Sequence, residues 1–228
     1  MFKRLMMLAV VGFMVFASSA AFAQFGGLKG MVDGVKKTVG GGASAGDLSA
    51  SKGSAVNAYL ASTQALTLSL EKAAEAFGVK TEVLEKLAVV KALKEGNIND
   101  KDLEKARKSS EEAQAIIKEK MTTTTAPSVE SKALMAESMI HLVDGIQKET
   151  ELVGEVQSLS SQAQAAVSSA SPMEMLKVKD IAGTALTLVK AVPMDLKLSK
   201  DILSAYLTYA KANNISTPSN ASNLLKGE

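Results

Sequence analysis

The chain has 228 residues, no cysteine, 4% aromatic residues, and 26 Lys plus Arg against 24 Asp plus Glu. Because no disulfide bond can form, the fold must take its stability from apolar burial. The nearly balanced charge and scarce aromatic rings exclude the clustered cations and stacking platforms of nucleic-acid-binding proteins, so we expect no nucleic acid partner.

Residues 1–23 have the three-part pattern of a secretory signal peptide. Lys3 and Arg4 precede an apolar stretch at 5–17, and small residues then end in Ala-Phe-Ala at 21–23. The alternative is a retained membrane anchor, but the apolar core is shorter than the ~20 residues that a spanning helix needs. We therefore predict cleavage after Ala23 and export to the periplasm or the cell exterior.

Loss of this segment also changes the charge of the protein. Lys3 and Arg4 leave with it, so Lys plus Arg falls from 26 to 24 and equals the 24 Asp plus Glu that remain. The exported protein is then predicted to carry no net charge, and Arg107 is its one arginine.

Residues 24–46 form a Gly-rich segment ahead of the predicted bundle. Between 24 and 39 apolar residues recur at helical spacing with Lys among them, and 40–46 has the composition of a flexible linker. Such an amphipathic arm can lie on a membrane surface or dock on a partner. The alternative is a poorly ordered N-terminus, which the helix-weakening glycines favour.

The rest of the chain has the apolar pattern of bundle helices, with alternating three- and four-residue spacing. Gly78 is expected as a left-handed cap, Thr81 and Asn99 or Asp100 as N-caps, and residues 122–127 as a loop. Helices are predicted at about 47–77, 81–95, 100–121, 128–169 and 172–212. The fold class is therefore all-α: an elongated up-and-down helical bundle over 47–213, with the last two helices long and antiparallel.

The last predicted helix carries two local signals. Ser171 and Glu174 have the spacing of a capping box, with Pro172 at the first helical position. Pro193 would ordinarily end a helix, but the apolar spacing continues through it in phase, which predicts one long helix kinked at Pro193. Residues 214–228 are expected to form a loose C-terminal tail.

Two polar residues of the 128–169 helix, Glu149 and Ser160, occupy positions where the pattern requires apolar side chains. Polar residues at such positions lower stability and can fix register and pairing.

The candidates for chemistry are few. Glu137, His141 and Asp144 fall at i, i+4 and i+7 and can share one helix face, which makes them the candidate metal ligands. The alternative is a solvated charged face with i,i+4 ion pairs, and this is favoured because Lys148, Glu151 and Glu155 continue the same stripe. With no Cys, a single His and no Gly-x-Ser-x-Gly motif, we predict no catalytic residue and no cofactor.

These observations predict a non-enzymatic, exported helical-bundle protein that acts as a scaffold, chaperone-like or partner-binding module, with a protein as its partner. The alternative is a lipid- or membrane-surface-binding helical protein that uses the 24–39 arm. A metal-dependent enzyme is the third hypothesis, and it rests on Glu137, His141 and Asp144 alone.

Overall fold

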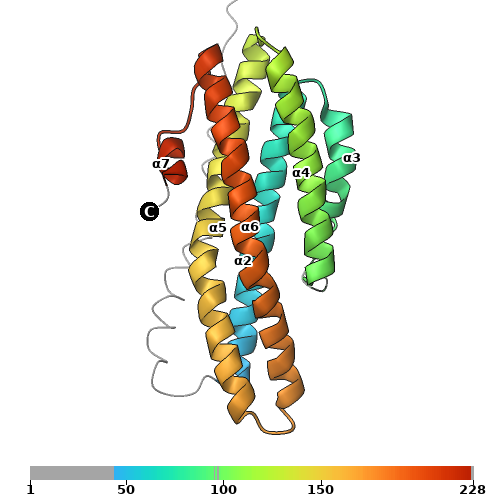
Figure 1. The fold of residues 1–228 in the computed structure, drawn as a ribbon, viewed down its shortest axis with the longest axis vertical. Helices are drawn as coiled ribbons and strands as arrows, with labels where there is room; N and C mark the ends of the chain where they lie inside the picture. Colours follow the sequence, from blue (N-terminus) through green and yellow to red (C-terminus); the bar gives the residue numbers. More distant parts are fainter. Residues whose placement is uncertain (1–43, 95, 97, 227–228) are drawn as a thin grey trace, which may run out of the picture. The chain divides into compact units, whose positions relative to one another are not determined.

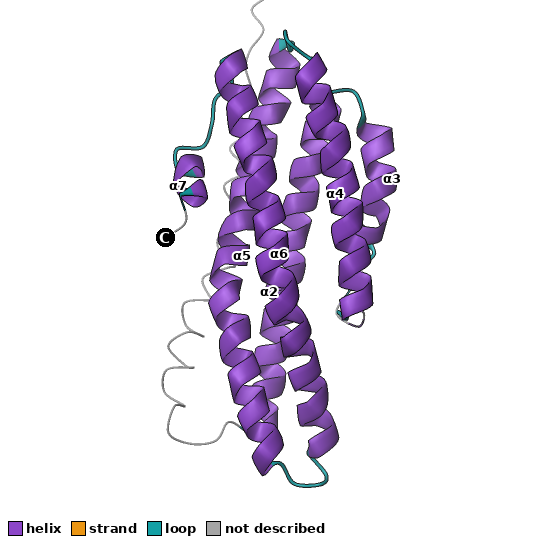
Figure 2. Ribbon diagram, viewed as in Figure 1, coloured by secondary structure: helices purple, strands orange, loops and turns teal. Residues whose placement is uncertain are grey.

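The computed structural model describes residues 44–94, 96 and 98–226, which belong to one compact unit that begins at Gly42. The described residues form helices and no strand (Figure 1, Figure 2). These helices are α2 (Ala45–Ala76), α3 (Lys80–Lys91), α4 (Asp100–Thr123), α5 (Val129–Ser169), α6 (Met175–Asn213) and α7 (Ala221–Leu225). The predicted all-α bundle is confirmed. The predicted signal peptide and the 24–39 arm lie outside the described residues.

Three long helices, α2, α5 and α6, run side by side along the bundle (Figure 1). At 41 and 39 residues, α5 and α6 are each about 60 Å long. The most extensive helix–helix interfaces join α2 to α5 and α5 to α6. The shorter α3 and α4 pack on each other, and α4 also contacts α2 and α6. None of the helices in the described ranges is long and apolar enough to cross a membrane.

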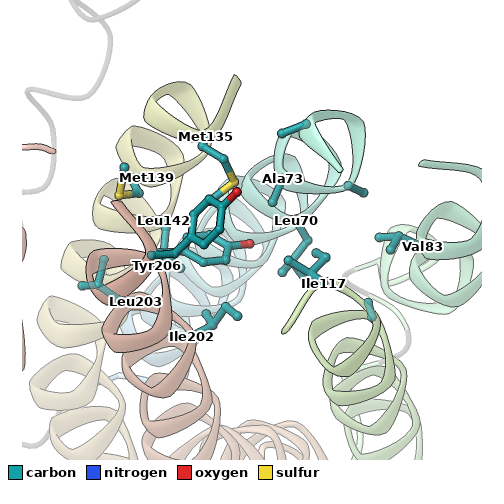
Figure 3. Close-up of a cluster of buried hydrophobic side chains, with 14 of the residues drawn as sticks. Leu70, Ala73, Val83, Ile117, Met135, Met139, Leu142, Ile202, Leu203 and Tyr206 are labelled. Carbon is teal, nitrogen blue, oxygen red and sulfur yellow. The ribbon is translucent and has the colours of Figure 1, made fainter. Parts of the chain in front are cut away.

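The buried apolar side chains form two clusters along the bundle. The first cluster, part of which is drawn in Figure 3, combines one end of α2, α5 and α6 with α3, α4 and α7, and Leu142 and Ile202 belong to it. The second cluster combines the other parts of the long helices, with Tyr59, Leu152 and Val192 among its members. The core is therefore two apolar blocks in succession.

Several predicted helix ends are confirmed. Gly78 has φ +69°, the left-handed conformation that favours glycine. Asn99 is the N-cap of α4, and its side chain accepts a hydrogen bond from the Asp102 amide at 3.1 Å. Helix α6 is continuous through Pro193, so one long helix is correct.

Two predicted N-caps are wrong. Val79 precedes α3, and its carbonyl accepts from the Val83 amide at 3.1 Å, so Thr81 already lies inside the helix. At the start of α6 the Ser171 hydroxyl donates to the Glu174 carboxylate at 2.7 Å instead of accepting from an amide. The Ser171 carbonyl accepts from the Glu174 and Met175 amides, both at 3.0 Å, so the helix begins only at Met175.

Ordered structure also extends further than predicted at both ends of the bundle. A capping box joins Ser44 to Asp47, so α2 begins inside the stretch assigned to the flexible linker. The expected loose tail contains α7, and both Ile215 and Ala221 are buried against α5 and α6. Their burial explains why the tail packs, since apolar contacts offset the entropy of ordering it.

Helices α2 and α5 approach each other closely at Gly145. A Cβ atom placed there would lie 2.6 Å from Cδ2 and 2.8 Å from Cγ of Leu66, and 3.3 Å from the Leu66 amide nitrogen. Gly154, also on α5, has no atom within 4 Å of its corresponding Cβ position. A side chain is therefore excluded at the first glycine and accommodated at the second.

We predict opposite effects of alanine at these two glycines. Gly145→Ala should lower the free energy of unfolding by about 1–3 kcal/mol through overpacking against Leu66. Gly154→Ala should raise it by up to about 1 kcal/mol, because alanine is the better helix former. Urea denaturation measures both, and a Gly145→Ala variant as stable as the parent would contradict the close approach.

Candidate functional site: a polar chamber inside the bundle

A cavity of about 40 Å³ lies among α2, α4, α5 and α6, with the end of α3 beside it. Since a water needs roughly 10–15 Å³ of such volume, the cavity has room for about two or three water-sized groups. We call it the chamber. The polar side chains that line it come from four helices: Tyr59, Thr63, Thr67, Arg107, Ser110, Gln114, Glu149, Asp195 and Ser199.

The chamber lies at the junction of the two apolar clusters. On α5, Ile146 belongs to the first cluster and Leu152 to the second, with Glu149 between them. On α6, Val192 belongs to the second cluster and Ile202 to the first, and Asp195 and Ser199 lie between. A polar layer therefore interrupts the hydrophobic core near the middle of the long helices.

Glu149 is the most deeply buried acid of this layer, with 1% of its surface exposed. Neither carboxyl oxygen has a hydrogen-bond partner among the residues that the structure describes. Burial raises the pKa of Glu149 well above its ordinary value, and the negative charge of Asp195 raises it further. The Ser199 hydroxyl, which donates to the Asp195 carbonyl oxygen at 2.9 Å, acts in the opposite direction and lowers the pKa of Glu149.

Asp195 is held from α2 by a direct hydrogen bond. The Tyr59 hydroxyl donates to Asp195 Oδ2 at 2.8 Å. Burial raises the pKa of Asp195 to about 6, although the bond from Tyr59 and the positive charge of Arg107 act in the opposite direction. Burial and the neighbouring carboxylates also raise the pKa of Tyr59, so its hydroxyl stays protonated and keeps donating.

Gln114 brings a third unpaired acceptor to the chamber. It is 4% exposed, and its Oε1 atom has no hydrogen-bond partner within the described ranges. Leaving a buried polar atom unpaired costs about 1–3 kcal/mol. With the two oxygens of Glu149, the chamber therefore presents acceptors that lack donors.

The residues predicted as metal ligands lie elsewhere, on another face of α5. Glu137 Oε1 accepts from Lys72 Nζ at 3.0 Å and lies 3.9 Å from His141 Nε2. Asp144 is paired with Lys148 one helical turn away. Across the part of the chain that the structure describes, no three His, Cys, Asp or Glu residues are grouped so that they can hold a metal. Glu137 and Asp144 thus serve as partners of lysines.

Sequence patterns indicated only part of the chamber. Glu149 stood out as a polar residue in an apolar position, and Tyr59 and Ser199 follow the apolar spacing of their own helices. Arg107 and Gln114 gave no comparable signal, because each lies in a stretch rich in charged or polar residues. Asp195 gave none because it falls beside the apolar spacing of its helix, one position before Leu196.

Comparison of the chain with protein-family models, with curated proteins and with solved structures finds no match. The chamber itself is therefore the basis for any functional proposal.

The raised pKa of Glu149 predicts how stability changes with pH. At pH values between the ordinary Glu pKa of about 4.3 and the higher pKa of Glu149 in the folded protein, the folded state binds more protons than the unfolded state. Stability should then fall as pH rises, by up to about 1.4 kcal/mol per pH unit for this group. Glu149→Gln removes the titration, so its stability relative to the parent should increase from pH 5 to pH 8.

Urea denaturation at several pH values measures this difference. Glu155→Gln is the control on the same helix, and its effect should be smaller because Glu155 is only partly buried. Equal pH dependence in the parent and Glu149→Gln would contradict the buried, uncompensated state of Glu149.

Proposed function

We propose that the protein is an exported, non-enzymatic binding protein whose chamber takes up a small ligand. The observation that carries this proposal is the set of unpaired acceptors of Glu149 and Gln114 facing a cavity with room for a few atoms. Export is supported by the signal-peptide pattern of residues 1–23.

The energetics favour a binding role over a purely structural one. Buried polar groups in folded proteins are nearly always hydrogen-bonded, and well-packed apolar side chains would fill the same space at less cost. The unpaired oxygens of Glu149 are therefore a loss of stability within a core that is otherwise well packed. A ligand that brings hydrogen-bond donors recovers this loss on binding.

The hydrogen bonds of the Tyr59 and Ser199 hydroxyls favour a binding role for the chamber over a catalytic role. A hydroxyl nucleophile needs an adjacent base that accepts its proton. The Tyr59 hydroxyl donates to the side chain of Asp195, and the Ser199 hydroxyl donates to the Asp195 backbone carbonyl, which is not a base. The Tyr59 hydroxyl thus positions the Asp195 side chain, and the Ser199 hydroxyl is bonded to the backbone of its own helix.

A bulky residue at the chamber tests this proposal. Ser110 of α4 lines the chamber and is only partly buried, so Ser110→Phe should fill the space without unfolding the bundle. Its neighbour Ser109 is also partly buried but does not line the chamber, which makes Ser109→Phe the matched control.

NMR titration with cationic, neutral and anionic compounds of two to four heavy atoms is the measurement. At least one compound should bind saturably to the parent and to Ser109→Phe, and bind at least tenfold more weakly to Ser110→Phe. Absence of binding by every compound, or unchanged binding to Ser110→Phe, would remove the proposal.

A scaffold or chaperone-like role toward a protein partner is the second candidate. Met173 and Leu176, at the turn between α5 and α6, are 93% and 81% exposed. Exposed apolar side chains that gather at one place are typical of interaction surfaces. Crosslinking in the compartment to which the protein is exported should capture a partner with the parent and not with the Met173→Ser/Leu176→Ser variant. Equal capture by the two proteins would count against this role.

The membrane-surface alternative concerns the 24–39 arm, which lies outside the described residues. Vesicle flotation with and without residues 24–39 tests it and leaves the Ser44 cap of α2 in place, and equal absence of vesicle binding would dispose of it.

A further inference from the structure

We infer that the chamber is a site for a small cation, specifically the ammonium group of a protonated primary amine, held by Glu149 and Gln114 with Asp195 beside it. This inference rests on the proposed binding function and names the class of ligand. It follows from the hydrogen-bonding capacity, the charge and the size of the chamber.

The unpaired atoms of the chamber are acceptors. Ionised Glu149 offers two oxygens and Gln114 offers Oε1, and none of the three has a donor within the described residues. The nearby hydroxyls of Tyr59 and Ser199 already donate to Asp195. An ammonium group carries three N–H donors and no acceptor, which matches three unpaired acceptors.

The charges of the chamber also favour a cation. Glu149 and Asp195 carry two negative charges when ionised, and Glu111 of α4 adds negative potential at Asp195. Arg107 supplies one positive charge from the same helix, and no ion pair joins it to Asp195 among the described residues. An anion would meet the buried carboxylate of Glu149 and the partly buried carboxylate of Asp195, whereas one cation neutralises the carboxylate that Arg107 leaves unbalanced.

In the absence of a cation, a proton on Glu149 serves the same purpose. Tyr59 of α2 and Asp195 of α6 are the titratable groups that interact with Glu149, and Arg107 and Glu111 of α4 act on Asp195 beside it. When the amine enters in its protonated form, the Glu149 carboxyl loses its proton to solvent and the N–H groups donate to the carboxylate. Binding of one ammonium therefore releases up to one proton.

The size of the chamber limits the bound group to about two or three heavy atoms. Methylammonium has two heavy atoms and three N–H donors. Tetramethylammonium has five heavy atoms and no N–H donor, so it should be excluded on both counts.

Titration of the purified full chain with methylammonium chloride tests the inference, with methanol, acetate, tetramethylammonium and magnesium chloride as comparison compounds. Methylammonium should bind saturably, and each comparison compound at least tenfold more weakly. Calorimetry in buffers of different ionisation enthalpy should detect the released proton.

Variants on one helix separate the role of Glu149 from a general effect of charge. Glu149→Gln should weaken methylammonium binding at least tenfold and abolish proton release, while Glu155→Gln should leave both unchanged. Gln114→Leu, which removes one acceptor from α4, is an independent variant and should weaken binding at least threefold. If Glu149→Gln does not fold into a cooperatively unfolding protein, the Gln114→Leu variant still tests the inference.

Failure of the inference is distinguishable from failure of the proposed function. Equal or tighter binding of methanol or acetate, sensitive to Ser110→Phe, would keep the binding function and overturn the ammonium assignment. Binding of magnesium without methylammonium would overturn it in the same way. If no compound binds, both proposals fail.

Discussion

The close packing of α2 against α5 is the constraint on which the rest of the structure depends. The chain has no disulfide and few aromatic rings, so its helices must approach closely to bury enough apolar surface. Gly145 permits this approach by leaving space for Leu66. Glu149 lies about one helical turn after Gly145 on α5, and Tyr59 lies about two turns before Leu66 on α2. The glycine contact therefore fixes the register that brings both side chains to the chamber.

The polar layer sets a balance between stability and binding. The two apolar clusters on either side hold the long helices together, and this lets the fold tolerate an acid with no hydrogen-bond partner in the described structure. A continuous apolar core would be more stable, but it would have no group to recognise a charged ligand. The free energy lost by burying the Glu149 carboxylate would be recovered when the proposed cation binds.

The sequence predicted the helices far better than their junctions or the chamber. Apolar spacing located every long helix, because a buried stripe leaves a periodic pattern. Helix caps were predicted less well. Ser171 has the Pro172 and Glu174 of a capping box, but its backbone carbonyl, and not its side chain, accepts the hydrogen bond from the Glu174 amide. Glu149 was recognisable because it interrupts an apolar stripe. Asp195 and Gln114 were not, since the packing of α2, α4 and α6 on one another brings them to the chamber.

Carboxyl-carbon NMR of the uniformly ¹³C-labelled protein, with the Glu149→Gln spectrum assigning the resonance, tests the central claim most directly. The Glu149 carboxyl should titrate well above the ordinary Glu pKa of about 4.3. Saturating methylammonium should shift this titration to lower pH. A Glu149 resonance that titrates near 4.3 with or without the amine would contradict both the buried acid and its role in binding a cation.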